Sequence, residues 1–196
     1  CGLCEKVCQY NEMPPKYVEE KFVFGGYHKN PKVRFESTSG GAFSAIVNAF
    51  CDENYVIFGA EAQGLNVFHS YIEDKLQLAK FRKSKYSQSV IGDSFKQVKS
   101  FLKEGKKVLF SGTPCQIAGL YCYLRKDYPN LLTIDVICHG VPSPKVWRLY
   151  LKECCYNLST KTTTCHNIKS IQNISFRNKQ WGWKKFSFLI ETLYDS

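Results

Sequence analysis

Two short apolar stretches, each followed closely by a cysteine, constrain the fold of this chain more than any other feature. Residues 107–112 (KVLFSG) lead to Cys115, and residues 131–137 (LLTIDVI) lead to Cys138. Each stretch is typical of a buried strand that ends in a turn. Ligands of an α/β sheet bind outside the carboxyl ends of its strands. If the two strands are parallel neighbours, both thiols face that crevice, which suggests a metal cluster, a redox pair or a nucleophile.

A helix is predicted directly after the first of these strands. Thr113 can cap it and Pro114 suits its first position, which places Cys115 in its first turn. The positive end of a helix favours a thiolate, and thiolate is the form that binds iron. The remaining internal cysteines are interpreted as structural: Cys51, Cys122, Cys154, Cys155 and Cys165.

The composition favours a globular protein with an adequate core. The chain has 196 residues, of which 44% are hydrophobic, and its ten cysteines cluster in motifs. We therefore expect a cytoplasmic protein with reduced or metal-bound thiols rather than a secreted disulfide framework. No apolar run approaches the ~20 residues of a membrane span. The net charge of +10 comes without any nucleic-acid motif, so an acidic carrier protein or a polyanionic cofactor is the expected partner.

The chain begins inside a cysteine motif. Cys1, Cys4 and Cys8 have the spacing C-x2-C-x3-C, which matches the last three cysteines of the bacterial ferredoxin run, although Gln9 stands where that run has proline. This spacing predicts a 4Fe–4S cluster, with a zinc knuckle as the alternative. Because there is no initiator methionine, we expect residues upstream, and the strand pattern near residue 190 suggests a continuation downstream.

The expected fold class is α/β, with a mixed or parallel sheet flanked by helices and a remnant of an N-terminal ferredoxin-like 4Fe–4S segment. Residues 1–15 are assigned to that segment and residues 16–196 to the main domain. Beyond the elements already named, we predict strands over 32–36 and 55–61, helices over 42–51, 93–104 and 144–155, and two strands from Ile174 around a turn near Gln180 and Gly182. In the second helix, Asp93 is the expected N-cap and Gly105 the stop.

Two loops are candidate phosphate sites. Residues 37–41 (STSGG) open a helix, where free N–H groups bind phosphate well, but capping by the hydroxyls of Ser37, Thr38 or Ser39 is equally compatible. Residues 80–89 form a basic polar loop that grips phosphate or is simply solvated. Trp181 and Trp183 could stack on a flat cofactor, with packing inside the hairpin as the safer interpretation.

Five segments, taken in this order, resemble one family. They are CGLCEKVC at 1–8, STSGG at 37–41, SKYSQS at 84–89, FSGTPCQIAGL at 110–120 and DVICHGVPSP at 135–144. The family is that of the coenzyme F420 hydrogenase/dehydrogenase beta subunits, which are iron–sulfur flavoproteins. The sequence departs from it at Lys83, where the family has glycine before SKY, and at Gln9.

The resemblance implies cofactors and the residues that hold them. Cys1, Cys4 and Cys8 would bind a ferredoxin-like 4Fe–4S cluster, and Cys115 and Cys138 a cluster nearer the flavin. FAD phosphate or ribose would be contacted from the two loops and from the turn before Cys115, by Ser37, Thr38, Ser39, Gly40, Gly41, Ser84, Lys85, Tyr86, Gln88, Ser89 and Thr113. His139, next to Cys138, would tune the cluster or the flavin, or serve only as a structural histidine.

The first functional hypothesis is therefore an oxidoreductase that passes electrons between 4Fe–4S clusters or a ferredoxin, FAD and a second substrate, coenzyme F420 or another organic acceptor. The expected partner is a ferredoxin or another electron-carrier subunit. Two alternatives stay open: a thiol redox protein in which Cys115 attacks and Cys138 resolves, and a zinc-stabilised binding module without catalytic activity.

Overall fold

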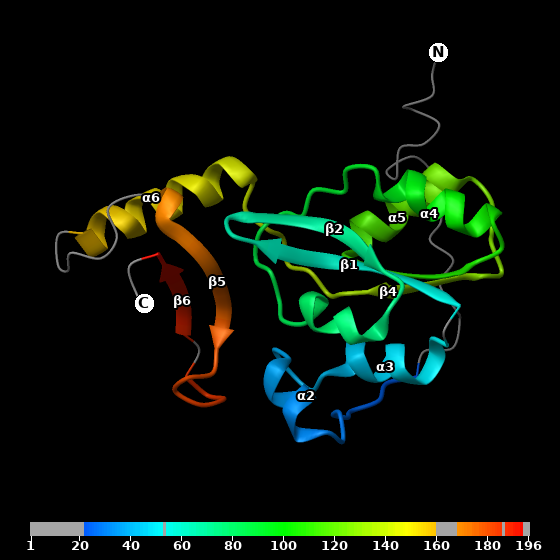
Figure 1. Ribbon diagram of the computed structural model, residues 1–196, viewed down its shortest axis with the longest axis horizontal. Coiled ribbons are helices and arrows are strands. Elements are labelled where there is room, and N and C mark those ends of the chain that lie inside the picture. The colour runs from blue at the N-terminus through cyan, green and yellow to red at the C-terminus, as the bar shows by residue number, and fades with distance from the viewer. Residues whose placement is uncertain (1–21, 53, 160–167, 186, 194–196) are drawn as a thin grey trace, which may run out of the picture.

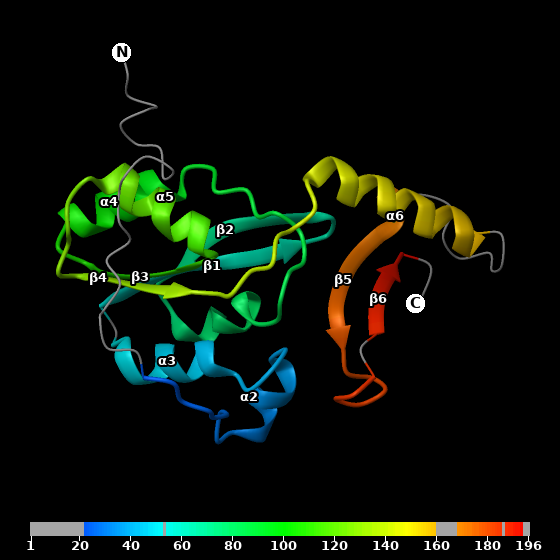
Figure 2. The same cartoon turned by 180° about the vertical axis from the view of Figure 1, so that it is seen from behind.

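The computed structural model describes residues 22–52, 54–159, 168–185 and 187–193 (Figure 1). They form a four-stranded sheet with helices on both faces and, beside it, a two-stranded hairpin with a long helix (Figures 1 and 2). The predicted α/β fold with a mixed sheet flanked by helices is confirmed. None of the helices in the described ranges is both long and apolar enough to cross a membrane.

The elements follow one another along the chain in a simple order. They are α2 (Pro31–Glu36), α3 (Ala42–Phe50), β1 (Tyr55–Gln63), β2 (Asn66–Ile72), the 3-10 helix η1 (Lys75–Phe81), α4 (Ser94–Lys103), β3 (Lys107–Gly112), α5 (Pro114–Leu124), β4 (Leu131–Asp135), α6 (Pro144–Ser159), the 3-10 helix η2 (Ile168–Ser170), β5 (Ile171–Asn178) and β6 (Ser187–Thr192).

The larger sheet has the strand order β2–β1–β3–β4, with β1, β3 and β4 parallel and β2 antiparallel to β1. The two strands that precede Cys115 and Cys138, β3 and β4, are therefore parallel neighbours, and their carboxyl ends share one edge. The antiparallel edge strand β2 was not predicted. Its sequence, NVFHSYI, places a histidine where an inward-facing apolar residue would complete the alternation.

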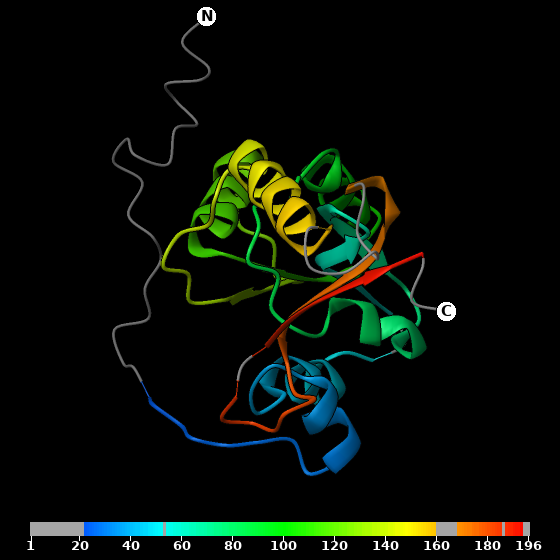
Figure 3. The same ribbon diagram turned by 90° about the vertical axis from the view of Figure 1, so that its left-hand side faces the viewer.

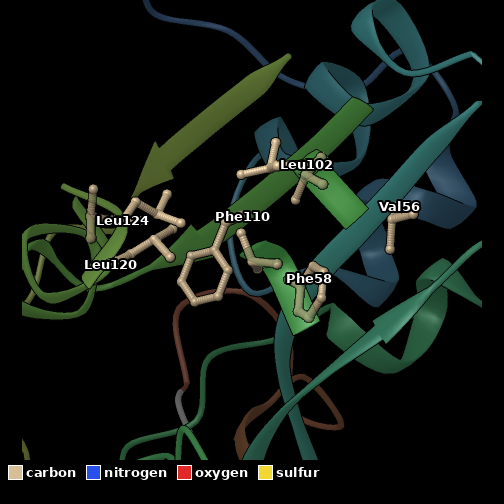
Figure 4. Packing of buried hydrophobic residues seen from close by; sticks show 9 residues of the cluster. Val56, Phe58, Leu102, Phe110, Leu120 and Leu124 are labelled. Carbon is tan, nitrogen blue, oxygen red and sulfur yellow. The ribbon is translucent and has the colours of Figure 1, made fainter. Parts of the chain in front are cut away.

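Alternation along the central strands divides the core between the two faces of the sheet. Val56 and Phe58 of β1 and Phe110 of β3 point towards α4 and α5, where Leu102 and Leu120 meet them (Figure 4). Their side chains are almost fully buried. Complete burial of such a side chain stabilises the fold by about 1.5–3 kcal/mol, so this face anchors α5 and with it the turn that carries Cys115.

The opposite face is covered by α3 and η1. Ile57 and Leu109 point to this side and pack against Val47 of α3 and Phe81 of η1. Cys51 lies in the same cluster, and its burial raises the pKa of the thiol to about 11. A thiol in that environment stays protonated near neutral pH, which agrees with its structural interpretation. Cys122, on the other face, is likewise buried, at 4% exposure.

The hairpin β5–β6 and α6 form a second, smaller core from Trp147, Leu151, Cys155, Ile171 and Ile174. Figure 3 shows the hairpin running beside α6 and reaching down towards α2. The predicted pair of strands is confirmed, although the first strand begins at Ile171, three residues earlier than expected.

Two predictions made for this part of the chain are wrong. The tryptophans in the hairpin turn do not pack inside the hairpin, because Trp181 is 67% exposed and Trp183 is 41% exposed. The helix predicted to end at Cys155 continues to Ser159. No helix-breaking residue follows Cys155 within that stretch, so the local sequence gives no stop signal at the paired cysteines.

The predicted strand over 32–36 is also wrong, since these residues form α2. The side-chain oxygen of Asn30 accepts hydrogen bonds from the amides of Lys32 and Val33, and Pro31 occupies the first helical position. These two start signals override the weak alternation that suggested a strand.

The helix predicted over 93–104 is present as α4. Asp93 stands at its N-cap, but the carboxylate pairs with Lys96 at 2.7 Å instead of accepting from the backbone. Gly105 follows the helix with φ at 81° and ends it as predicted. This helix therefore begins through its packing against the sheet more than through its cap.

Candidate functional site

The two cysteines hold equivalent places at the carboxyl edge of the sheet. The last registered pair between β3 and β4 joins Gly112 to Asp135. Cys115 and Cys138 each lie three residues beyond that pair, and the amide of Val136 still donates to the carbonyl oxygen of Gly112 at 2.8 Å. The side chain of Cys115 is exposed and that of Cys138 is half-buried, and neither forms a disulfide. Two reachable thiols therefore follow adjacent parallel strands at the same offset.

Cys115 lies in the first turn of α5, as predicted. Thr113 is the N-cap and Pro114 the first helical residue. The backbone amide of Thr113 donates to Oε1 of Gln116 at 3.0 Å, which is half of a capping box. The hydroxyl of Thr113 lies 3.1 Å from the sulfur of Cys115. The residues that start the helix thus also surround the thiol.

Cys138 is held by a backbone contact. The amide of Gly140 donates a hydrogen bond to its sulfur, at an N···S distance of 3.3 Å. Gly140 reaches this position with φ at 106°, in the region that glycine favours. Both candidate sulfurs therefore have a hydrogen-bonding group within reach. His139 is exposed, and its predicted tuning role stays a prediction.

The loop 84–89 is tied to the start of α5 by a chain of three buried or half-buried hydrogen bonds. Nε2 of Gln116 lies 2.8 Å from Oγ of Ser89, and that hydroxyl lies 3.0 Å from Nδ1 of His69. Nε2 of His69 lies 3.1 Å from the carbonyl oxygen of Ser111. A carbonyl only accepts, so Nε2 carries the proton, Nδ1 accepts from Ser89, and Ser89 accepts from Gln116. Each of the three donors in this series of hydrogen bonds therefore has one acceptor.

His69 is the residue of this site that sequence reasoning undervalued. Only 7% of its surface is exposed, and its ring stacks on that of Phe110 at 5.1 Å between centroids. Burial lowers the pKa of the imidazole, which keeps it neutral and suits the donor pattern. The signal in the sequence was its position within an apolar strand, but its partners lie 20 and 42 residues away along the chain.

The loop 37–41 contacts the loop 84–89. Oγ1 of Thr38 accepts from the backbone amide of Ser84 at 2.7 Å, while Oγ of Ser37 donates to the carbonyl oxygen of Val33. The N-cap of α3 is Gly41, with φ at 82°, and no side chain caps the helix. The proposed capping by Ser37, Thr38 or Ser39 is therefore wrong, and no described side chain caps the amides of the first turn of α3.

Lys85 sits at the centre of the basic loop. Its ammonium donates to the carbonyl oxygens of Arg82 at 2.8 Å and Lys80 at 3.2 Å. Burial lowers its pKa to about 8, against the attraction of Glu61. Tyr86 meets the hairpin, with its ring edge-to-face against Phe176 at 5.5 Å. The loop thus connects the larger sheet with the smaller unit.

The structure brings most of the predicted flavin residues into two touching loops, but it gives only two of the predicted iron ligands. Gly40 and Gln88 lie in these loops, with Gln88 exposed. Cys1, Cys4 and Cys8 fall outside the described residues, as does Cys165. Within the described ranges, no three His, Cys, Asp or Glu side chains are grouped closely enough to hold a metal ion.

Comparison with known proteins bears on the edge that carries Cys115 and Cys138. Residues 105–191, which run from the start of β3 into β6, match the family described as the C terminus of the beta subunit of coenzyme F420 hydrogenase/dehydrogenase. This match supports the resemblance to the coenzyme F420 hydrogenase/dehydrogenase beta-subunit family. The matched range includes Thr113, Cys115 and Cys138, whereas the loops 37–41 and 84–89 precede it.

A solved structure agrees with this family in its fold. The chain is similar to a chain of the F420-reducing [NiFe] hydrogenase complex from Methanosarcina barkeri, with a TM-score of 0.50 and 15% sequence identity. The similarity covers 85% of this chain but 55% of that one, so this chain spans about half of its neighbour's length. No curated protein matches it in sequence.

Proposed function

We propose that this chain is part of an iron–sulfur flavoprotein oxidoreductase, which passes electrons between 4Fe–4S clusters or a ferredoxin, FAD and a second substrate. The observation that carries the proposal is the matched placement of Cys115 and Cys138, three residues beyond the last pair of two adjacent parallel strands. The family supports an oxidoreductase of the hydrogenase/dehydrogenase type, and the cofactors are our inference.

The two thiols suit two of the ligands of a cluster. They follow adjacent parallel strands at one edge of the sheet, and the groups around them, the Thr113 hydroxyl and the Gly140 amide, can hydrogen-bond to coordinated sulfur. Such hydrogen bonds help to set the reduction potential of an iron–sulfur cluster. The remaining ligands would come from elsewhere, and Cys1, Cys4 and Cys8 would hold the ferredoxin-like cluster of the segment 1–15.

The two loops suit the phosphate or ribose of FAD. The uncapped first turn of α3 offers amides and the positive end of a helix dipole, next to the hydroxyl of Ser39. Thr38 and Ser84 fix the two loops against each other, and the charge of Lys85 adds attraction for an anion. FAD would exchange a hydride or an electron pair with the second substrate.

The series of hydrogen bonds that includes His69 gives residues of this protein a role in positioning the two cofactor sites. It ties the flavin loop at Ser89 to Gln116, which lies in the same helical turn as Cys115. A fixed separation between the two cofactor sites is what electron transfer between them needs. The second substrate would be coenzyme F420 or another organic acceptor, and the net charge of +10 suits an acidic molecule or an acidic ferredoxin.

The test is to determine iron, acid-labile sulfide and released flavin per chain in protein purified without oxygen. The chain should be expressed together with any coding sequence that flanks it. We expect iron, sulfide and FAD together. Zinc without flavin would support the binding-module alternative instead. A colourless protein without metal that is active through its thiols would support the thiol redox alternative.

A further inference from the structure

A second feature is a small pocket between α2 and the hairpin turn. It has a volume of about 330 Å³ and is lined, besides Pro31, by Tyr27, His28, Lys29, Arg34, Phe35 and Trp183, which we call the Arg34 pocket. Three of these six side chains are aromatic and three are basic or imidazole. Among the residues that the structure describes, no acidic side chain lines it.

The guanidinium of Arg34 lies close to two of the aromatic rings. Its guanidinium carbon lies 4.2 Å from the ring centre of Tyr27 and 5.4 Å from that of Trp183. Stacking occupies the flat faces of a guanidinium and leaves its N–H edge to pair with a carboxylate or a phosphate. Tyr27 is 67% exposed and Trp183 is 41% exposed, so ring surface beside that edge is open to a ligand.

Within the described ranges, no ion pair balances the positive charge around this pocket. The ammonium of Lys179 lies 3.3 Å from the ring centre of Trp183 and donates to the carbonyl oxygens of Phe35 and Ser37. Burial, Arg34 and Lys83 lower its pKa. The only acidic residue of α2, Glu36, already pairs with Arg82 at 2.5 Å. A bound anion would relieve this repulsion.

His28 links the pocket to the flavin loop. Its amide donates to the carbonyl oxygen of Gly40 at 2.7 Å, so the loop 37–41 is hydrogen-bonded to one of the residues that line the pocket. Its Nδ1 accepts from the amide of Asn30 at 3.1 Å, which leaves Nε2 as the donor of the neutral ring. Nε2 of His28 is thus a second hydrogen-bond donor of the pocket, besides the guanidinium of Arg34.

We propose that the Arg34 pocket binds a nucleotide, with a flat base against Tyr27 or Trp183 and a phosphate at the edge of Arg34. Its volume is at the lower end of the range for ligand sites, about 300–1,000 Å³, which suits one nucleotide. The nucleotide is either the AMP half of FAD, in which case the inference rests on the proposed function, or a separate molecule.

The test is to titrate the purified protein separately with AMP, adenosine and inorganic phosphate. Binding is measured by isothermal titration calorimetry and by tryptophan fluorescence. We expect AMP to bind more tightly than adenosine or phosphate alone. Arg34→Gln should weaken AMP binding about tenfold, since one charge-assisted hydrogen-bonding group is lost. The control, Lys32→Gln, removes one positive charge from the same helix outside the pocket and should change nothing.

Two further measurements complete the test. Trp183→Leu should also weaken AMP binding, which covers the case in which Arg34→Gln folds poorly. AMP binding that persists under saturating FAD assigns the pocket to a separate nucleotide, and competition assigns it to the AMP half of FAD. The inference is overturned if adenosine binds as tightly as AMP, or if both variants bind AMP normally. Flavin content is measured independently, so either proposal can fail alone.

Discussion

Nε2 of His69 donates a hydrogen bond to the carbonyl oxygen of Ser111, reaching from β2, where His69 pairs with Ala60 of β1, to β3. The ladder between β1 and β3 stops at the pair Phe58 and Phe110. The neighbouring carbonyl, that of Gly112, accepts from Val136 on the β4 side, so the carbonyl of Ser111 faces the other way. The imidazole therefore supplies the donor that the missing strand pairing would have supplied.

The first prediction concerns the pH dependence of stability. Burial lowers the pKa of His69 below its ordinary value of 6.5, so the unfolded chain takes up this proton more readily than the folded one. The stability contributed by the neutral ring is complete above pH 6.5 and is lost as the pH falls below it. Urea unfolding at pH 7.5 and 5.5 should show a smaller loss in His69→Gln than in the wild type. An equal loss in both would contradict this, and His139→Gln serves as the exposed control.

The second prediction concerns the contact between the two loops. Thr38→Val keeps the shape of the side chain but leaves the Ser84 amide without its acceptor. The free energy of unfolding should fall by about 1–3 kcal/mol, and less FAD should be retained because the loops lose their fixed relation. Thr38→Ser keeps the hydroxyl and should restore both properties. If Thr38→Val retains FAD fully, the contact serves only the fold.

The third prediction uses the charge of Lys85. Its pKa of about 8 means that the ammonium loses its proton as the pH rises from 7 to 9, whereas an ordinary lysine, at 10.5, stays charged. If this charge attracts the FAD phosphate, the affinity for FAD should fall about tenfold over that range. Lys85→Arg stays charged and should flatten the profile. A wild-type affinity that does not change between pH 7 and 9 would show that Lys85 only supports the loop backbone.

The fourth prediction tests the uncapped turn of α3 as a phosphate site. Ser39→Asp places a negative charge beside the amides of that turn and should reduce FAD occupancy by repelling the phosphate. Ser39→Asn has a similar size without the charge and should retain FAD. Flavin released per chain is the measurement. Equal flavin content in the two variants would remove the loop 37–41 from the flavin site.

The sequence predicted the parts of this site that depend on short-range signals. The apolar runs of β3 and β4 and the threonine and proline before Cys115 define the strand ends and the start of α5, and the structure has them as expected. The prediction failed at α2, where the Asn30 cap outweighs a weak strand pattern.

Other features depend on neighbours that are distant in the sequence. The role of His69 follows from the point where β1 and β3 separate, and that point is set by tertiary packing. The contact of the Trp183 ring with Arg34 joins residues that lie 149 positions apart in the chain. No local pattern encodes either contact, so both required the folded structure.

The most direct test of the central claim is the iron content of two cysteine variants. Cys115→Ser and Cys138→Ser, purified without oxygen, should each lose the iron and acid-labile sulfide of one cluster and the matching visible absorbance. Cys154→Ser, a half-buried cysteine on α6, should keep the wild-type amounts. Full retention of iron and sulfide in both Cys115→Ser and Cys138→Ser would contradict the account and leave the carboxyl edge of the sheet without a cluster.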